Sequence, residues 1–221
     1  MLLRTDYNSN PNIGTLAAVN DRVAIVPPQA PPEFVSTIEE ALEVEVLKTT
    51  LCSTSLVGVF LAMNNRGMLV CSQAEKRELE VLECSGMRVE VVEERHNALG
   101  NLILASDAGA LAYSGLQEET KSALERVMGC RVRMVDSLGG YRTVGSIGAA
   151  NQRGVLLHPS LSEAELELVE DALEVRAEVG TVNMGVGFVR TGMLVNSRGA
   201  VVGSETTGVE MMRIQDVFEL S

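Results

Sequence analysis

The sequence predicts an α+β fold in which five ββαβ units close into a ring with pseudo-fivefold symmetry and with their helices outside. The first observation is a frame of strand and turn, bounded by two glycines in its clearest copies, that begins at Gly14, Gly58, Gly100, Gly145 and Arg190 and recurs every 42 to 45 residues. The second is the same order of patterns within each frame, and the third is that the two ends of the chain complement each other. A steady period of this length indicates a repeat architecture.

The fourth copy shows the start of a unit most clearly. Two short apolar runs, 146–150 and 155–157, flank the sequence Asn-Gln-Arg-Gly. Such runs around a turn predict a β-hairpin that is buried on both faces. The turn glycine, Gly154, can adopt a positive φ at no steric cost, and we interpret the paired glycines of the frame as turn and close-packing residues.

A helix and a third strand follow the hairpin in each unit. In the fourth, Ser162 precedes Glu165 by three residues, which is the spacing of a capping box at a helix start. Three other helices are predicted over 34–42, 74–83 and 118–128, and a fifth begins after Thr207. The third strands are predicted over 44–46, 87–91, 131–135 and 174–179. Each helix carries its charges on one side, which predicts helices on the rim of the ring.

The two ends of the chain each hold an incomplete unit. Residues 2–7 read as a third strand with no hairpin or helix before it, and the last unit ends after its helix with no third strand. We therefore expect the N-terminal strand to complete the fifth unit and close the ring, which removes exposed sheet edges. The prediction is one domain over residues 1–221.

Composition limits the functional classes. The chain has 30 acidic and 18 basic residues, which gives a net charge of −12. This charge excludes electrostatic binding of nucleic acid over the whole surface, but it is compatible with a local RNA contact or a basic protein partner. Its four cysteines lack metal-ligand spacing, so free thiols in a reducing cytoplasm are expected, with no metal and no cofactor. With no apolar run of membrane length, the prediction is a soluble, cytoplasmic protein without a membrane partner.

Few residues suggest catalysis. His158 lies at a strand end before a proline and is expected to be structural, and His96 is expected to be a surface residue. Four turns share an Asn-x-Arg pattern that ends in an arginine, at Arg22, Arg66, Arg153 and Arg198. We interpret these arginines as links to neighbouring units, because recurrence in every repeat is typical of a scaffold role. The alternative is a circle of arginines that binds an anion or RNA.

The loops that join one unit to the next differ from unit to unit. They cover 8–12, 49–55, 94–99, 136–143 and 181–187 and are rich in Asn, Ser, Thr and Gly. We expect them to gather at one end of the ring as a polar, largely neutral platform, since variable loops on a rigid scaffold commonly carry binding functions.

Several segments resemble one known family. NIGTLAAVN at 12–20, VEERHNALGN at 92–101, RGVLLHP at 153–159, VGTVN at 179–183 and GMLVN at 192–196 are similar to the archaeal and eukaryotic translation initiation factor six family over essentially the whole chain. The resemblance implies the pentein fold, which agrees with the repeat pattern. It also implies a non-enzymatic factor that binds the intersubunit face of the large ribosomal subunit, near the sarcin-ricin loop of the rRNA and ribosomal proteins, and blocks the small subunit sterically.

The resemblance also implies which residues face the ribosome. Carried over by position, these are Asn12, Gly14, Gly58, Val59, Asn97, Gly100, Asn101, Asn183, Gly185 and Phe188. The family implies roles in translation initiation and large-subunit biogenesis, and we expect a monomer with no small-molecule substrate.

Two alternatives stay open at this stage. Other pentein families modify guanidine groups with a Cys nucleophile, a His and carboxylates in the central channel, so a guanidine-modifying hydrolase or transferase is the second hypothesis. No cysteine follows Cys130, and neither histidine has an evident partner, which weighs against it. The third hypothesis is a ring that binds another protein through its loop platform.

Overall fold

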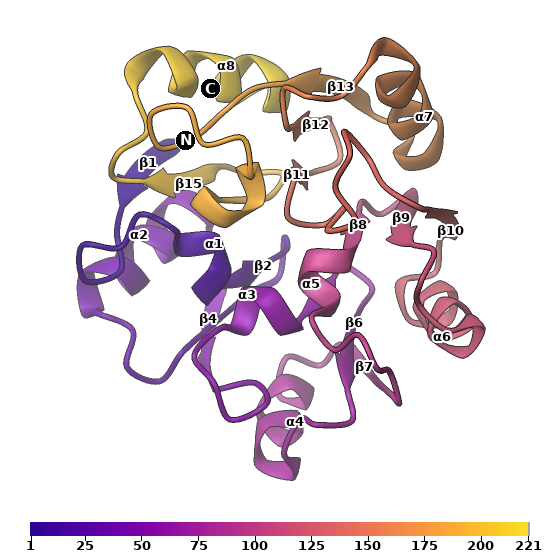
Figure 1. The fold of residues 1–221 in the computed structure, drawn as a ribbon. Helices are drawn as coiled ribbons and strands as arrows, with labels where there is room; N and C mark the ends of the chain where they lie inside the picture. The colour runs from indigo at the N-terminus through magenta and orange to yellow at the C-terminus, as the bar shows by residue number, and fades with distance from the viewer. Residues whose placement is uncertain (221) are drawn as a thin grey trace.

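The computed structural model describes residues 1–220 and contains five three-stranded sheets, each with one long helix (Figure 1). In the fourth unit, β11 (Gly148–Ala150) pairs antiparallel with β12 (Gly154–Leu157), α7 (Glu163–Leu173) follows, and β13 (Arg176–Val179) pairs parallel with β12. Every residue of β12 is buried. The predicted ββαβ order and the hairpin buried on both faces are confirmed.

The other units repeat this arrangement. The first has β2 (Ala18–Val19), β3 (Val23–Val26), α2 (Pro32–Leu42) and β4 (Glu45–Lys48). The second has β5 (Ala62–Met63), β6 (Gly67–Cys71), α4 (Lys76–Glu83) and β7 (Arg88–Val92). The third has β8 (Ile103–Ala105), β9 (Gly109–Tyr113), α6 (Glu118–Met128) and β10 (Arg131–Val135), and the fifth has β14 (Met193–Val195), β15 (Ala200–Gly203) and α8 (Gly208–Phe218).

The N-terminal strand closes the ring as the sequence predicts. β1 (Leu2–Thr5) pairs parallel with β15, in a register that places Leu3 opposite Val201 (Figure 1). The first strands of neighbouring units contact one another around the axis, and the contact between β14 and β2 completes the circle. The fifth unit is therefore built from both ends of the chain.

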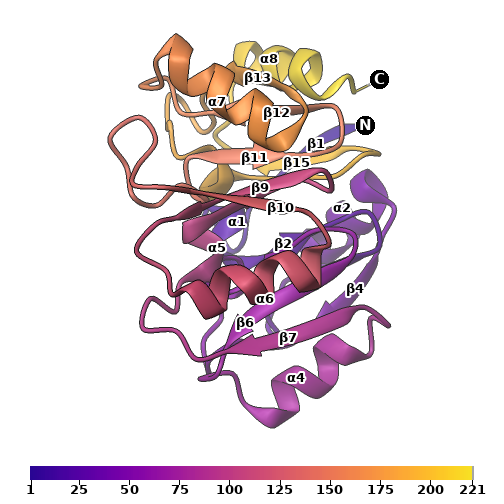
Figure 2. The same ribbon diagram turned by 90° about the vertical axis from the view of Figure 1, so that its right-hand side faces the viewer.

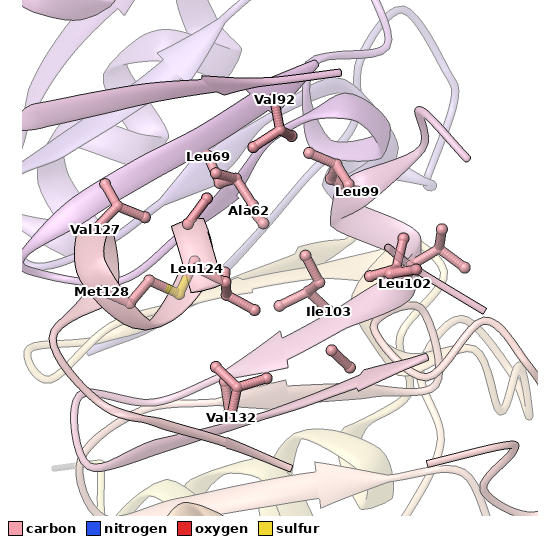
Figure 3. Close-up of a cluster of buried hydrophobic side chains, with 14 of the residues drawn as sticks. Ala62, Leu69, Val92, Leu99, Leu102, Ile103, Leu124, Val127, Met128 and Val132 are labelled. Carbon is pink, nitrogen blue, oxygen red and sulfur yellow. The ribbon is translucent and has the colours of Figure 1, made fainter. Parts of the chain in front are cut away.

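The helices lie outside, and each packs over the sheet of the preceding unit. Helix α6 contacts β6 and β7 of the second unit, and α2 contacts β15 and β1 of the fifth. In one interior cluster, Leu124 and Val127 of α6 meet Leu69 of β6 and Ile103 of β8 (Figure 3). Because each helix buries its apolar face between two units, neighbouring units are interlocked.

Short helical turns begin four of the five units, where the sequence predicted strand. They are α1 (Ile13–Leu16), α3 (Val57–Phe60), α5 (Leu99–Leu102) and the 3-10 helix η1 (Val189–Gly192). A single turn has no apolar periodicity to reveal it. In the fourth unit, a turn over 144–146 takes this place.

The second glycine of the frame is needed for space rather than for a positive φ. Gly154 is not among the residues with positive φ, so it does not use the conformational freedom of glycine, and its close-packing role is the one observed. A Cβ at Gly154 would lie 2.3 Å from the carbonyl oxygen of Val217, and one at Gly109 would lie 1.8 Å from that of Ala172. The glycines let the end of the neighbouring helix approach the turn closely.

No helix in residues 1–220 is long and apolar enough to cross a membrane. Over the same residues no group of His, Cys, Asp and Glu is arranged to hold a metal ion. The four cysteines are free thiols, and burial raises the pKa of Cys71 to about 12 and that of Cys130 to about 11. The two thiols are therefore protonated at neutral pH and unreactive as nucleophiles.

Candidate functional site

The ring has two different ends. In each unit the third strand runs parallel to the central strand, so both finish on the side away from the hairpin turn. The five joining loops therefore gather at one end, called here the loop end, and the five hairpin turns gather at the other, the turn end. Figure 2 shows the loops after β7 and β10 together on the left of the molecule. The predicted loop platform is present.

Four of the five loops are tight turns closed by a single β-bridge. The bridges are Tyr7 to Asn10, Leu51 to Thr54, Leu138 to Tyr141 and Val182 to Val186. Inside each turn, consecutive residues have positive φ: Asn8 and Ser9, Cys52 and Ser53, Gly139 and Gly140, and Asn183 to Gly185. Two successive positive φ values are typical of the type I′ turn, which leaves the chain little freedom.

A helix carboxylate holds three of these turns in place. The Glu210 carboxylate accepts hydrogen bonds from the backbone N–H groups of Met184 at 3.2 Å and Gly185 at 2.9 Å. Glu78 does the same for the turn at Cys52, and Glu165 for the turn at Gly139. Each of these glutamates is also the N3 residue of a capping box, so one side chain fixes a helix start and a platform loop together.

The third unit reverses this arrangement. Glu94 lies in the loop and is buried, and its carboxylate accepts from the backbone N–H of Gln117 at 2.9 Å and the hydroxyl of Thr120 at 2.8 Å, at the start of α6. Burial alone would raise the pKa of Glu94, but these hydrogen bonds and others outweigh it and lower the pKa. Four loops of the loop end are thus fixed by ionised carboxylates, of which Glu78, Glu94 and Glu210 are buried and Glu165 is half-buried.

The loop end carries little of the acidic excess. Met184, at the tip of the fifth loop, is 68% exposed, and Arg95 and Arg142 are exposed on two other loops. The exposed acids of the same loops include Glu93 and Asp136. The surface is close to neutral, with cationic and apolar points of contact, while the long helices carry most of the acidic residues.

Three of the four glycines predicted as site residues, Gly14, Gly58 and Gly100, lie in the hub of the ring. A Cβ at Gly14 would lie 1.8 Å from the carbonyl oxygen of Arg190, one at Gly58 2.0 Å from that of Gly14, and one at Gly100 2.1 Å from that of Gly58. All three glycines are buried. Their evident role is to let the short turns meet around the axis.

The other predicted site residues divide by exposure. Asn183 is buried, and its Nδ2 donates to the carbonyl oxygen of Pro11 at 3.0 Å. The remaining predicted residues lie at the surface of the loop end: Asn12 and Gly185 are exposed, and Val59, Asn97, Asn101 and Phe188 are half-buried. The structure brings these six to one end of the ring.

An aromatic cluster at the loop end was missed by the sequence analysis. The rings of Tyr141 and His158 lie 4.9 Å from each other, and Phe188 lies 5.0 Å from Tyr141 and 5.6 Å from His158. His158 Nδ1 accepts a hydrogen bond from the backbone N–H of Ser160, so its predicted structural role is confirmed. His96 is exposed, as expected, and its ring lies edge-on to that of Tyr113.

The turn end is held by asparagine and arginine side chains. Asn196 Oδ1 accepts from two N–H groups of its own turn, and its Nδ2 donates to the carbonyl oxygen of Asn20 in the next unit at 3.2 Å. Arg153 donates from Nη1 to the carbonyl oxygen of Glu219 at 2.8 Å, beyond the end of α8. Arg66 and Arg198 reach the ends of α6 and α2 in the same way. The structural interpretation of these three arginines is confirmed.

Within residues 1–220, the cavities of the central channel are not lined by a cysteine and histidine pair. The cavity at the turn end is lined by Asp21, Asn65, Asp107 and Gln152 among others, and the amides of Asn65 and Gln152 each donate to both carboxylates. No cysteine or histidine of the described chain lines this cavity or the one beneath it. The pattern of the second hypothesis, a cysteine with a histidine, is not assembled there.

Comparison with solved structures shows which fold this is. The N-terminal domain of ArgZ, an arginine dihydrolase from Cyanobacteria, aligns with a TM-score of 0.57 at 11% identity, covering 86% of this chain and 76% of that one. A dimethylarginine dimethylaminohydrolase aligns with a TM-score of 0.50 at 14% identity, covering 76% and 68%. The similarity is one of fold, and the fold is the pentein.

Comparison with sequences gives the family. The model of the eIF-6 family matches residues 2–217. Translation initiation factor 6 from Methanoculleus marisnigri is 39% identical over 217 residues, covering 96% of this chain and 96% of that protein. The factor from Methanosphaerula palustris is 36% identical over 218 residues, covering 99% and 98%. The chain therefore belongs to the eIF-6 family, a family of translation factors rather than enzymes, and has a role in translation initiation.

Proposed function

We propose that the protein binds the large ribosomal subunit at its intersubunit face, near the sarcin-ricin loop, and sterically prevents association with the small subunit. The observation that carries the proposal is the loop end: loops of four different units are fixed by carboxylates, three buried and one half-buried, into one rigid, nearly neutral face. A pre-organised face loses little conformational entropy on binding.

Charge supports the loop end as the binding face. rRNA repels an acidic surface, and the long helices that carry most of the acidic residues lie on the rim. Arg95 and Arg142 can approach phosphates, and the exposed Met184 suits an apolar patch on a ribosomal protein. Both kinds of contact occur on a ribosomal surface. In this proposal the protein is a cytoplasmic monomer that blocks the small subunit by steric exclusion and catalyses no reaction. It also takes part in large-subunit biogenesis.

Two arginine substitutions test which end binds. Arg142→Glu places a negative charge at the loop end, and Arg22→Glu makes the same change to an exposed arginine at the turn end. We expect Arg142→Glu to weaken co-sedimentation with large subunits about tenfold, roughly 1.4 kcal/mol, and Arg22→Glu to bind like wild type. An equal loss in both variants would contradict the assignment of the face.

Asn101→Ser provides a second test with no change of charge. Asn101 is half-buried in α5, and its backbone carbonyl accepts from Gly145 N at 2.9 Å, so the hub is kept when the side chain is shortened. Weaker binding of this variant to large subunits, with unchanged thermal unfolding, is the expected result. Binding equal to wild type at low and high salt would remove Asn101 from the proposed face.

A further inference from the structure

The fifth unit has an arginine where the other four have the hub glycine. Arg190 occupies the position of Gly14, Gly58, Gly100 and Gly145 in the repeat, and it lies in η1. Its backbone takes part in the hub, since its carbonyl oxygen is the one that a Cβ at Gly14 would meet. Its side chain has no counterpart in the other units.

Arg190 lines a cavity on the ring axis. This cavity has a volume of about 40 Å³ and is lined by Gly14, Ala17, Met193 and Arg190 itself, together with residues from all five first strands. A second cavity of about 40 Å³ continues from it toward the turn end and shares five of its lining residues, Val19, Met63, Ala105, Ala150 and Val195. These five come one from each unit and form an apolar collar between the two cavities.

No acidic side chain of residues 1–220 forms an ion pair with the Arg190 guanidinium. Its Nε is buried without a hydrogen-bond partner in the described chain, and Arg190 forms no ion pair within residues 1–220. The carboxylates of Asp21 and Asp107 lie beyond the apolar collar and share the amide donors of Asn65 and Gln152. Both carboxylates therefore accept hydrogen bonds from these two amides and form no ion pair with Arg190.

The guanidinium is charged although its Nε is enclosed. Desolvation lowers the pKa of Arg190 to about 10, which is still well above neutral pH. Arg190 is half-buried as a whole, but an enclosed N–H donor without a partner is unfavourable, so a native protein satisfies it with an anion or with ordered water. The cavity has room for about three waters, or for one small anion with a water.

We propose that the cavity beside Arg190 is a binding site for one small monovalent anion, a halide or a compact oxyanion such as nitrate. The planar guanidinium offers five N–H donors and no acceptor, so it selects an anion over a cation. A cavity volume of about 40 Å³ suits one ion of this size. Because η1 contacts α1 across the seam between the fifth and first units, a bound anion stabilises ring closure.

Bromide is the direct probe, because it scatters X-rays anomalously. Crystals of wild type and of Arg190→Met are grown in sodium bromide and measured at the bromine absorption edge. We expect an anomalous peak within hydrogen-bond distance of the guanidinium in wild type and none in the cavity of the variant. A wild-type cavity that holds only water in these crystals would overturn the proposal.

Thermal unfolding tests the site in solution with a matched control. Arg153→Met also removes one arginine, but one that lies at the turn end and bonds to a carbonyl. Gluconate is replaced by bromide at constant ionic strength. Above the Kd for bromide, each tenfold rise in bromide concentration should lower the unfolding equilibrium constant about tenfold in wild type and in Arg153→Met. Arg190→Met should not respond. An identical response of all three chains would contradict the proposal, and if Arg190→Met does not fold, the wild-type crystals decide.

Discussion

Asn183 Nδ2 donates to the carbonyl oxygen of Pro11 at 3.0 Å, which joins the loop of the fifth unit to the loop of the first unit across the seam of the ring. Asn183 is buried, and its Oδ1 also accepts from the hydroxyl of Thr206 at 3.0 Å. The seam where the two ends of the chain meet is therefore held at the loop end by a side chain as well as by the pairing of β1 with β15.

Asn183→Ala should lower the free energy of unfolding by about 2 kcal/mol, because it leaves the buried partners without their hydrogen bonds. Its neighbour Met184 also has a positive φ but is exposed, so Met184→Ala is the matched control and should change stability by less than about 0.5 kcal/mol. Urea unfolding measures both values. Equal losses would show that the Asn183 hydrogen bonds do not support the seam.

Removal of residues 1–5 should destabilise the protein by about 3 kcal/mol or more, because it strips β1 from β15 and exposes a sheet edge. Thermal unfolding and light scattering should report a lower midpoint and aggregation. Arg4→Ala keeps the strand and changes an exposed side chain, so it should stay within about 0.5 kcal/mol of wild type. A truncated chain as stable as wild type would be incompatible with ring closure by β1.

Gly58→Ala should cost about 3 kcal/mol, because the new Cβ would lie 2.0 Å from the carbonyl oxygen of Gly14 in the hub. Gly208→Ala makes the same change at the first residue of α8, where a Cβ would meet no atom within 4 Å, and should stabilise the protein by about 0.5 kcal/mol. Differential scanning calorimetry of the pair checks the sign of both effects. Gains in both variants would show that the hub can relax to accept a side chain.

Acidification should remove the stabilisation that the Glu210 carboxylate gives to the loop end. Burial would raise the pKa of Glu210, but hydrogen bonds from Thr207, Thr181 and Gly185 outweigh it and lower the pKa below the ordinary 4.5. Since the folded-state pKa is the lower one, the stability from Glu210 is fully present above pH 4.5 and is lost as the pH falls through the folded value.

Glu210→Gln tests this linkage. The variant should be less stable than wild type at neutral pH and should lose less stability than wild type between about pH 5 and about pH 3. Glu167→Gln, at an exposed position of α7, should follow the wild-type curve. The measurement is the urea midpoint as a function of pH, and parallel curves for wild type and Glu210→Gln would refute the role given to the carboxylate.

The repeat pattern was enough to predict most of the fold. The period, the capping box of Ser162 and Glu165 and the lone strand at residues 2–7 are local signals, and each corresponds to an observed element. The helix predicted over 118–128 has the observed bounds. The short turns such as α3 were missed because four residues give no periodicity. Glycine is required at position 154 by steric contact with another unit rather than by a positive φ.

The candidate site was less accessible to sequence reasoning because its structure depends on contacts between units. The loops were recognised by composition, but the turn at Cys52 and Ser53 has no glycine or asparagine to signal its positive φ values. The capping box predicted the helix start, whereas the second bond of Glu165, to Gly139 N at 2.8 Å, joins residues far apart in the sequence. The arginine at position 190 was visible in the frame, but its place on the axis was not.

The most direct test of the central claim is a subunit-joining measurement. Large subunits are saturated with the protein, small subunits are added, and joined particles are followed by light scattering and sucrose-gradient sedimentation. We expect joining to fall in proportion to occupancy, with the protein found only on free large subunits. Co-sedimentation of the protein with joined ribosomes, at undiminished joining, would contradict the account.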